Sequence, residues 1–163
     1  MQEKLPIILS IYFSYNQFMI FDRSVDLPGC AWTKTHVDQG FARRENCLCV
    51  GTLLEFGEAD VMVHMGPYDM REPYERVISV PIELSSGEVA IEGPEDDLEG
   101  QRFVNMDSGH YRLTAAQLVT GENHEKIDLF FEKLNEPLKA SRIVIGDEAL
   151  HPPSPLLESA EAA

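Results

Sequence analysis

Positive charge is scarce in this sequence. Thirteen Lys and Arg residues face 28 Asp and Glu residues, which gives a formal net charge of −15 at pH 7. Because a surface this negative repels phosphate groups, direct binding to nucleic acid or to an anionic membrane is disfavoured. The charge instead favours a basic protein as the partner.

Cysteines and long apolar runs are also few. The three cysteines, Cys30, Cys47 and Cys49, are odd in number and widely placed, so the sequence implies no disulfide framework and fits a reducing, cytoplasmic setting. No stretch reaches the ~18 apolar residues that a transmembrane helix needs. The apolar run 5–13 contains polar residues and lacks a cleavage site, so we interpret it as a strand and not as a secretion signal.

Recognisable catalytic and metal-binding motifs are absent. The sequence has no Gly-rich phosphate loop, no G-x-S-x-G elbow and no H-E-x-x-H motif. Cys47 and Cys49 would share one face of a strand, but two ligands do not make a metal site, and we interpret both as buried core side chains. Ser108 and His110 lack a third group to orient the imidazole. We therefore predict a protein without catalytic residues, cofactor or metal.

What the sequence does contain is a series of short strand-like segments, rich in Ile, Val, Phe and Tyr and bounded by turn residues. The predicted strands are residues 7–14, 17–22, 47–55, 59–65, 74–84, 88–92, 101–105, 110–119, 126–134 and 140–146. Residues 125–134 also show helical spacing, so helix and strand both stay open there. This pattern predicts a mainly β fold, a single-domain antiparallel β-sandwich or barrel of about 8–10 strands.

One helix and a C-terminal tail complete the predicted organisation. Thr33 can cap a short helix near residues 33–43, which would carry two arginines at its C-terminal end. Residues 1–149 are expected to form the sandwich-like domain. The acidic, Pro- and Ala-containing segment 150–163 is expected to be a flexible tail outside the core.

The negative charge is concentrated in residues 83–99, which contain seven acidic residues and no Lys or Arg. Gly93 and Pro94 predict a loop that presents carboxylates together. Such a row can occupy the Lys- and Arg-lined cleft of a nuclease, although a merely solvated loop has the same composition. The candidate partner-binding residues here are Glu92, Glu95, Asp96, Asp97 and Glu99.

A second group of candidate partner-binding residues precedes this segment. Glu58 and Asp60 follow a glycine between two strands, and Tyr68 and Met70 lie in a predicted loop among prolines. Soft and aromatic side chains are favoured at protein interfaces. Trp32, the only tryptophan, is interpreted as a core anchor because of the area it buries.

Several segments together resemble the ComJ family, the bacterial competence protein J group. They are residues 14–21 (SYNQFMIF), 31–33 (AWT), 39–42 (QGFA), 74–81 (YERVISVP), 89–92 (VAIE), 109–114 (GHYRLT) and 127–131 (IDLFF), in matching order and spacing across residues 7–134. The resemblance implies a compact, mainly β, non-catalytic protein that binds and blocks a nuclease. It transfers no binding residue, and the segments 93–99 and beyond 146 depart from the pattern.

The nature of the partner and one other function stay open. The nuclease could be a DNA-entry nuclease, or a nuclease-domain toxin for which this chain is the immunity protein. In the alternative, the chain is a β-sandwich module for a sugar, a lipid or Ca²⁺, with the carboxylates of residues 95–99 as Ca²⁺ ligands. A hydrolase with a carboxylate pair is disfavoured because no local catalytic pattern supports it.

Overall fold

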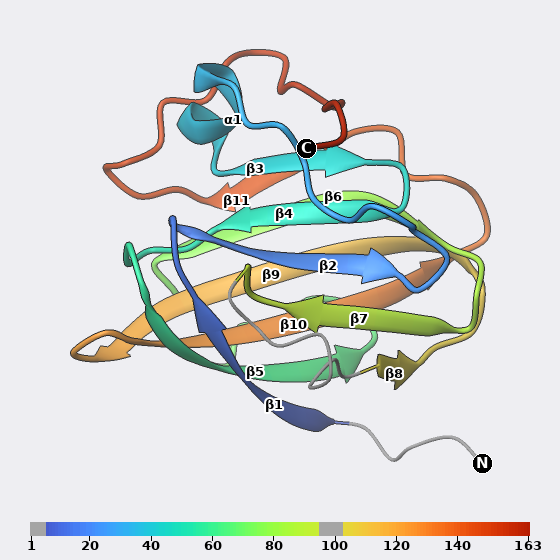
Figure 1. Ribbon diagram of the computed structural model, residues 1–163, viewed down its shortest axis with the longest axis horizontal. Coiled ribbons are helices and arrows are strands. Elements are labelled where there is room, and N and C mark those ends of the chain that lie inside the picture. Colours follow the sequence, from blue (N-terminus) through green and yellow to red (C-terminus); the bar gives the residue numbers. More distant parts are fainter. Residues whose placement is uncertain (1–5, 95–102) are drawn as a thin grey trace.

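Two β-sheets packed face to face form the body of the protein in this computed structural model (Figure 1). The structure describes residues 6–94 and 103–163. The elements are β1 (Ile7–Phe13), β2 (Gln17–Asp22), α1 (Lys34–Gln39), β3 (Phe41–Arg44), β4 (Cys47–Gly51), β5 (Gly57–Met65), β6 (Arg76–Leu84), β7 (Glu88–Glu92), β8 (Phe103–Asn105), β9 (Gly109–Gly121), β10 (His124–Leu134) and β11 (Arg142–Ile145). One sheet has the order β1-β5-β10-β9-β6-β11, and the other has the order β3-β4-β2-β7-β8. The predicted mainly β sandwich is confirmed.

Strand pairing follows the antiparallel prediction with one exception among the named strands. Strands β5 and β10 run parallel, with Glu58 opposite His124 and Val63 opposite Leu129. The other pairs are antiparallel, including the β1–β5 and β9–β10 pairs on either side of this one. The parallel pair therefore lies inside the six-stranded sheet and not at its edge.

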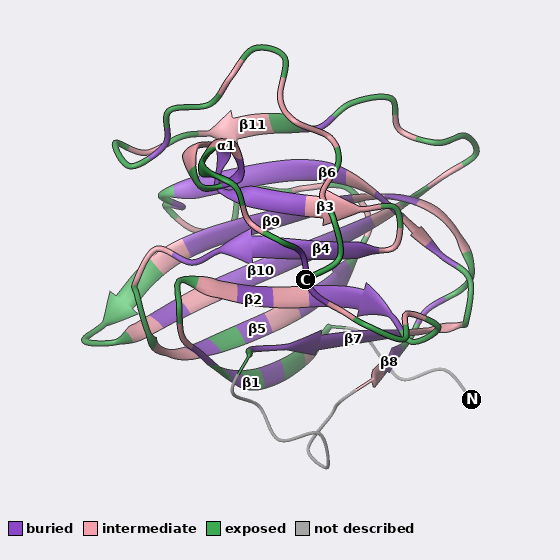
Figure 2. Cartoon of the chain, turned by 45° about the horizontal axis from the view of Figure 1, so that its top comes forward, coloured by how far each residue is buried: buried purple, intermediate pink, exposed green. Residues whose placement is uncertain are grey.

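The alternation of side chains explains how the two sheets pack. In β1, Leu9, Ile11 and Phe13 are at most 7% exposed, whereas Ile8 before them is 64% exposed and Tyr12 between Ile11 and Phe13 is 60% exposed. In the inner strands β4, β6 and β10 most residues are buried, whichever face they lie on (Figure 2), and the apolar side chains between the two sheets form one core. Each fully buried aliphatic or aromatic side chain contributes about 1.5–3 kcal/mol to folding.

The segment whose pattern fitted both helix and strand is strand β10. Ile127, Leu129 and Phe131 point into the core between the sheets. Phe130 lies on the outer face, in a separate buried cluster with Tyr74. Apolar residues occupy both faces of this strand, so its sequence does not alternate cleanly between apolar and polar residues. The spacing of its apolar residues therefore fits a helix as well as a strand.

Helix α1 is shorter than predicted. The Thr33 hydroxyl accepts the N–H of His36 at 3.4 Å, which confirms the expected N-cap. The helix ends at Gly40, which has a left-handed conformation with a φ of 84°. Residues 41–44 form strand β3 and not the last helical turn, because Phe41 and Ala42 are fully buried beside β4. No helix in the described part of the chain is long and apolar enough to cross a membrane.

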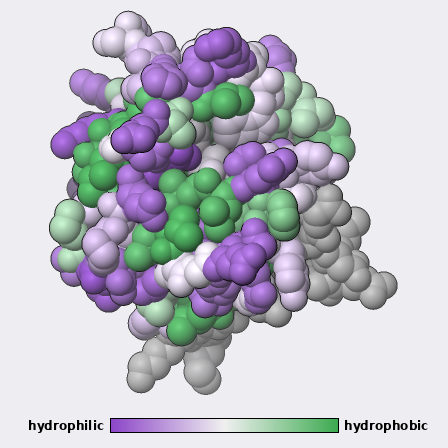
Figure 3. All heavy atoms as spheres, turned by 90° about the vertical axis from the view of Figure 1, so that its left-hand side faces the viewer, coloured by the Kyte–Doolittle hydropathy of each residue, from purple (hydrophilic) through white to green (hydrophobic). Residues whose placement is uncertain are grey.

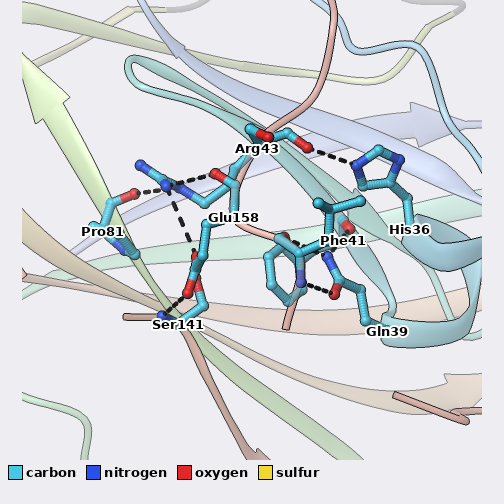
Figure 4. A network of polar contacts seen from close by, with 9 residues as sticks. His36, Gln39, Phe41, Arg43, Pro81, Ser141 and Glu158 are labelled. Carbon is cyan, nitrogen blue, oxygen red and sulfur yellow. Dashed lines mark hydrogen bonds and ion pairs between the residues drawn. The ribbon is translucent and has the colours of Figure 1, made fainter. Parts of the chain in front are cut away.

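The C-terminal segment 150–163 packs against the molecule, which differs from the expected tail outside the core. The amide of Gln39 donates to the carbonyl oxygen of Leu157 at 2.9 Å and accepts its N–H at 2.8 Å. The carboxylate of Glu158 accepts the N–H and the hydroxyl of Ser141 at 2.6 and 2.5 Å (Figure 4). These partners come from distant segments, so the Pro- and Ala-containing composition of the segment does not reveal them.

Candidate functional site

Several chain segments meet at one end of the sandwich, on the left in Figure 1. They are the β1–β2 turn (14–16), the α1–β3 junction (37–40), the β4–β5 segment (51–58), the β9–β10 turn (119–124) and residues 147–150 after β11. We call these residues together the loop end. Loops held on a rigid scaffold are the usual location of binding residues.

Backbone hydrogen bonds join these segments into one surface. The N–H of Asn16 donates to the carbonyl oxygen of Glu55 at 2.9 Å, and the N–H of Thr52 donates to the carbonyl oxygen of Asn16 at 2.9 Å. The N–H of Glu58 donates to the carbonyl oxygen of Asn123 at 3.0 Å. The loop end therefore has a defined shape, set by the ends of β1, β2, β4, β5, β9 and β10.

Two residues fix the β4–β5 segment against β10. Gly57 has a φ of 153°, and a Cβ atom there would lie 2.2 Å from the carbonyl oxygen of Asn123, so only glycine allows this approach. The fully buried carboxylate of Glu125 accepts the N–H of Leu54 at 2.8 Å. Burial raises the pKa of Glu125, and the backbone hydrogen bonds to Leu54 and Leu53 oppose that rise only in part.

Large apolar side chains are exposed at the loop end. Tyr15 is 76% exposed, Val37 60% and Phe56 55%. Tyr15 and Asn16 both have positive φ values, 54° and 57°, and this tight turn points the tyrosine ring into solvent. Figure 3 shows apolar residues in the middle of this end, with hydrophilic residues around them. Contiguous apolar surface of this kind is typical of sites that bind a protein, a membrane or a ligand, so the loop end is the candidate site.

A pocket of about 450 Å³ opens at the loop end. Its lining residues are Tyr15, Asn16, Gln17, Trp32, Val37, Gly40, Gly51, Thr52, Leu53, Arg76, Ala149 and Leu150. The guanidinium of Arg76 pairs with the carboxylate of Asp147 at 2.6 and 3.0 Å and donates to the carbonyl oxygen of Gly51 at 3.2 Å. Because Asp147 neutralises this cation, the pocket offers apolar walls and no free positive charge from Arg76.

Carboxylates surround the apolar centre of the loop end. Glu55, Glu122 and Glu148 are exposed there, and each lies on a segment that also carries apolar surface. Glu75, also exposed, accepts the N–H of Val119 at 2.8 Å and so lies beside the β9–β10 turn. The loop end thus combines an apolar centre with a negative rim.

Two of the predicted partner-binding residues lie at or beside this end. Glu58 accepts a hydrogen bond from the Ser10 hydroxyl at 2.9 Å. The side chain of Asp60 is 55% exposed and lies 3.1 Å from the imidazole Nε2 of His124. Their binding role remains a prediction, but their position extends the negative rim along the first residues of β5.

Tyr68 and Met70 lie on a different part of the molecule. Tyr68 packs edge-on against Phe130, with ring centroids 5.5 Å apart, and Met70 is 64% exposed. Phe130 is opposite His64, and His64 is four residues from Asp60, roughly 13 Å along β5. The structure therefore does not bring Tyr68 next to the carboxylates of Glu58 and Asp60.

The loop that carries Tyr68 and Met70 is fixed by a buried polar cluster on the outer face of the sheet. The hydroxyl of Tyr74 donates to the carboxylate of Asp128 at 2.5 Å, and Nε2 of His64 lies 3.0 Å from the other oxygen. Burial and the hydrogen bond to Asp128 raise the pKa of Tyr74. Lys126 pairs with Glu72 at 2.9 Å, so this cluster anchors the loop and explains the burial of Asp128.

The candidate residues of the acidic segment 83–99 fall into two groups, one described by the structure and one outside the described residues. Glu92 ends strand β7 and is only 6% exposed, so its prediction as an exposed partner-binding carboxylate was wrong. It lies opposite Met19, inside the five-stranded sheet. The other candidates, Glu95, Asp96, Asp97 and Glu99, lie outside the described residues.

The exposed apolar residues of the loop end were not among the sequence-based candidates. The Tyr15-Asn16 pair predicted a tight connection, and a tyrosine at the tip of such a turn has no neighbours to cover it. Trp32, expected as a core anchor, is partly buried, donates from Nε1 to Gln17 at 2.9 Å and lines the pocket. The exposure of Tyr15 could thus be predicted from the sequence, whereas the exposure of Val37 and Phe56 depends on how loops that are distant in the sequence meet.

Comparison with known proteins gives a family and two similar structures. The model of the family described as competence protein J (ComJ) matches residues 10–136. The crystal structure of ComJ from Bacillus subtilis, an inhibitor of the DNA-degrading activity of NucA, matches with a TM-score of 0.64 and 16% identity, over 78% of this chain and 96% of that chain. A structure described as crocagin biosynthetic gene J matches with a TM-score of 0.50 and 14% identity, over 78% of this chain and 98% of that one. The search of curated proteins gave no match. Both structures share the fold, and because the family model covers most of the sequence, this chain belongs to the ComJ family.

Proposed function

We propose that this protein is a non-catalytic inhibitor that binds a bacterial nuclease and blocks it. Two findings support the proposal: membership of the ComJ family, and the shared fold with an inhibitor of the DNA-degrading activity of NucA. The observation that carries it is the loop end, where exposed apolar residues lie within a rim of carboxylates.

The apolar centre supplies the anchors of the complex. Tyr15 and Phe56 are more than half exposed, so burying them against a partner removes a large apolar area from water. Aromatic residues near the middle of an interface contribute most of the binding free energy when a ring of polar residues excludes water. The pocket beside Trp32 can accept a side chain of the nuclease.

The carboxylate rim supplies specificity for a basic partner and a high rate of association. A nuclease lines its DNA-binding cleft with Lys and Arg, and Glu55, Glu122 and Glu148 can pair with these cations where phosphates would lie. The net charge of −15 accelerates encounter with a basic partner through long-range attraction. Inhibition then follows from competition with the DNA backbone and requires no chemistry by the inhibitor.

The partner is either a DNA-entry nuclease or a secreted effector toxin with a nuclease domain. Both present a basic cleft, so the loop end fits either. Inhibition assays with a purified nuclease of each kind from the same organism separate them, because a stoichiometric inhibitor blocks its own target at equimolar concentration and leaves the other active.

The test of the loop end is a DNA-degradation assay combined with measurement of the dissociation constant. Y15A and F56A each remove an anchor and are expected to weaken binding by about 30-fold. I8A is the matched control, since Ile8 is 64% exposed on β1 outside the loop end. If Y15A and F56A inhibit as well as the unmodified protein, the loop end is not the contact surface.

The charge component is tested separately. The double variant E55K/E122K is expected to slow association and to reduce its dependence on ionic strength. E136K is the control, because Glu136 is exposed after the end of β10 that lies opposite the loop end. We also propose Asp96 and Asp97 as contacts, and D96K/D97K tests them. An effect confined to that variant would mean that Glu55 and Glu122 are not contacts.

A further inference from the structure

Cys30 meets Cys47 and Cys49, the two cysteines of β4, on the outer side of the five-stranded sheet. The Sγ atoms of Cys30, Cys47 and Cys49 all lie within 4.8 Å of one another. Cys30 is 5% exposed, and Cys47 and Cys49 are fully buried. A metal ion with metal–sulfur distances of about 2.3 Å holds three thiolates about 4 Å apart in a trigonal arrangement, which is compatible with this cluster.

The strand register places two of the thiols, and a loop brings the third. Cys47 and Cys49 lie two residues apart on β4, so both point to the face away from the core between the sheets. Arg44 fixes the loop before Cys30, because its guanidinium donates to the carbonyl oxygens of Leu27 and Gly29 at 2.7 and 3.0 Å. The cluster is therefore held in place by strand β4 on one side and by the loop before Cys30 on the other.

The surroundings favour thiolate at the centre of the cluster. The N–H of Gly29 donates to the Sγ of Cys47 at 3.5 Å. Thiolates are the form of cysteine that binds metal ions, so the thiol protons leave when an ion binds.

The donor set is composed of sulfur alone. Met19 is directly opposite Cys49 and packs against the same cluster, so a thioether lies beside the thiols. The cluster also contains Phe21, Ala42 and Ala90, which offer no polar side chain. Among residues 6–94 and 103–163, no His, Asp or Glu joins the three cysteines as a fourth ligand of the kind that structural zinc sites use. Soft thiolate and thioether ligands suit Cu(I), and the lack of a fourth ligand among the described residues disfavours a tetrahedral zinc site.

We propose that Cys30, Cys47 and Cys49 bind one Cu(I) ion through their three thiolates, with the thioether of Met19 as a soft neighbour. The positive charge of Arg44 beside the cluster offsets part of the negative charge of such a complex. This site is separate from the loop end and does not depend on nuclease inhibition.

The C-terminal segment closes the site. Ala162 forms a β-bridge with Cys30, and the N–H of Ala31 donates to the carbonyl oxygen of Glu161 at 2.8 Å. Ala160 packs against the cluster. An ion must therefore enter while this segment is displaced, and once bound it is shielded from water and oxidants.

The test is an anaerobic titration of the reduced, full-length protein with Cu(I) in the presence of a competing Cu(I) chelator. We expect one equivalent to bind per chain, a rise in melting temperature and protection of all three thiols from a thiol reagent. C30A and C49A are expected to lower the affinity at least 100-fold, while M70L, which changes an exposed methionine outside the cluster, leaves it unchanged.

Three outcomes would overturn the proposal. One is binding no stronger than that of the triple variant C30A/C47A/C49A. Another is binding of Zn(II) in preference to Cu(I), which would mean that the donor set is not selective for the softer ion. The third is equal reactivity of the thiols in the unmodified protein with and without Cu(I); this measurement needs no variant and therefore stands even if a cysteine variant does not fold.

Discussion

The side-chain amide of Gln39 makes with Leu157 the two hydrogen bonds that a neighbouring strand would make. Its Nε2 donates to the carbonyl oxygen at 2.9 Å, and its Oε1 accepts the N–H at 2.8 Å. Gln39 is fully buried, so no water can replace these bonds when the C-terminal segment is in place. A side chain at the end of α1 thus makes the pair of bonds that a β-strand would make, and it holds the segment 150–163 together with the contacts of Glu158 and Glu161.

The first prediction concerns this contact. Replacing Gln39 by Ala leaves the N–H and carbonyl of Leu157 without these partners, which is expected to cost about 1–3 kcal/mol of stability. Hydrogen exchange in residues 150–163 should rise together with the loss of melting temperature. K34A is the control, since Lys34 is on the same helix but its side chain is 87% exposed. Unchanged exchange in Q39A would show that other contacts hold the segment.

The second prediction concerns Asp22. Burial alone would raise its pKa, but hydrogen bonds from Ser24, Ser85 and Ser86 outweigh burial and lower the pKa from 3.8 to about 2. The resulting stabilisation, about 2 kcal/mol, is present above the unfolded pKa and is lost as the pH falls from about 4 to 2. D22N should lose it at pH 7. Urea unfolding across this range checks both statements, and a D22N curve parallel to that of the unmodified protein would contradict them.

The third prediction concerns Glu125, whose contribution to stability depends on pH in the opposite direction to that of Asp22. Burial raises its pKa in the folded state, so the protonated form is favoured by folding. The stabilisation is therefore complete below the unfolded pKa and is lost as the pH rises through the folded pKa. E125Q keeps an acceptor for the N–H of Leu54 and removes the charge. We expect its stability to be flat over pH 4–8 while that of the unmodified protein declines, as measured by urea unfolding.

The fourth prediction compares two glycines. G57A forces a Cβ atom to within 2.2 Å of a backbone oxygen and is expected to cost about 3 kcal/mol. Gly87 has a φ of 84° but open space around it. G87A is therefore expected to lower stability by about 1 kcal/mol, through the strained backbone conformation alone. Thermal unfolding measures the difference. Equal losses would mean that the close approach at Asn123 relaxes freely.

The sequence predicts the strands well because their patterns are local. The spans of β2 and β7 match their predicted ranges, since turn residues bound both of them. The end of α1 was misplaced because Phe41 and Ala42 continue a helical pattern, and only their burial beside β4 makes them a strand. Tertiary packing here outweighs local preference.

The candidate site was less predictable for a related reason. Charge at Glu58 and Asp60 is visible in the sequence, and both lie at or beside the loop end. The exposure of Val37 and the meeting of Cys30 with the two cysteines of β4 depend on contacts between segments distant in the chain. Composition also does not predict the docking of residues 150–163, since several of the hydrogen bonds of this segment use distant partners, such as Gln39, which is 118 positions from Leu157.

The parallel pairing of β5 with β10 bears on how fast the chain folds. It joins Glu58 to His124, 66 positions later, in the interior of the six-stranded sheet. Closing so long a loop costs entropy before any contact is gained, and domains dominated by such pairings fold in milliseconds to seconds. On the ribosome, β1 and β5 can pair once β5 has emerged, but β5 must wait for β10 before its second edge is covered. During that interval β5 exposes an unpaired edge, which makes the growing chain most vulnerable to aggregation before residue 134 is synthesised.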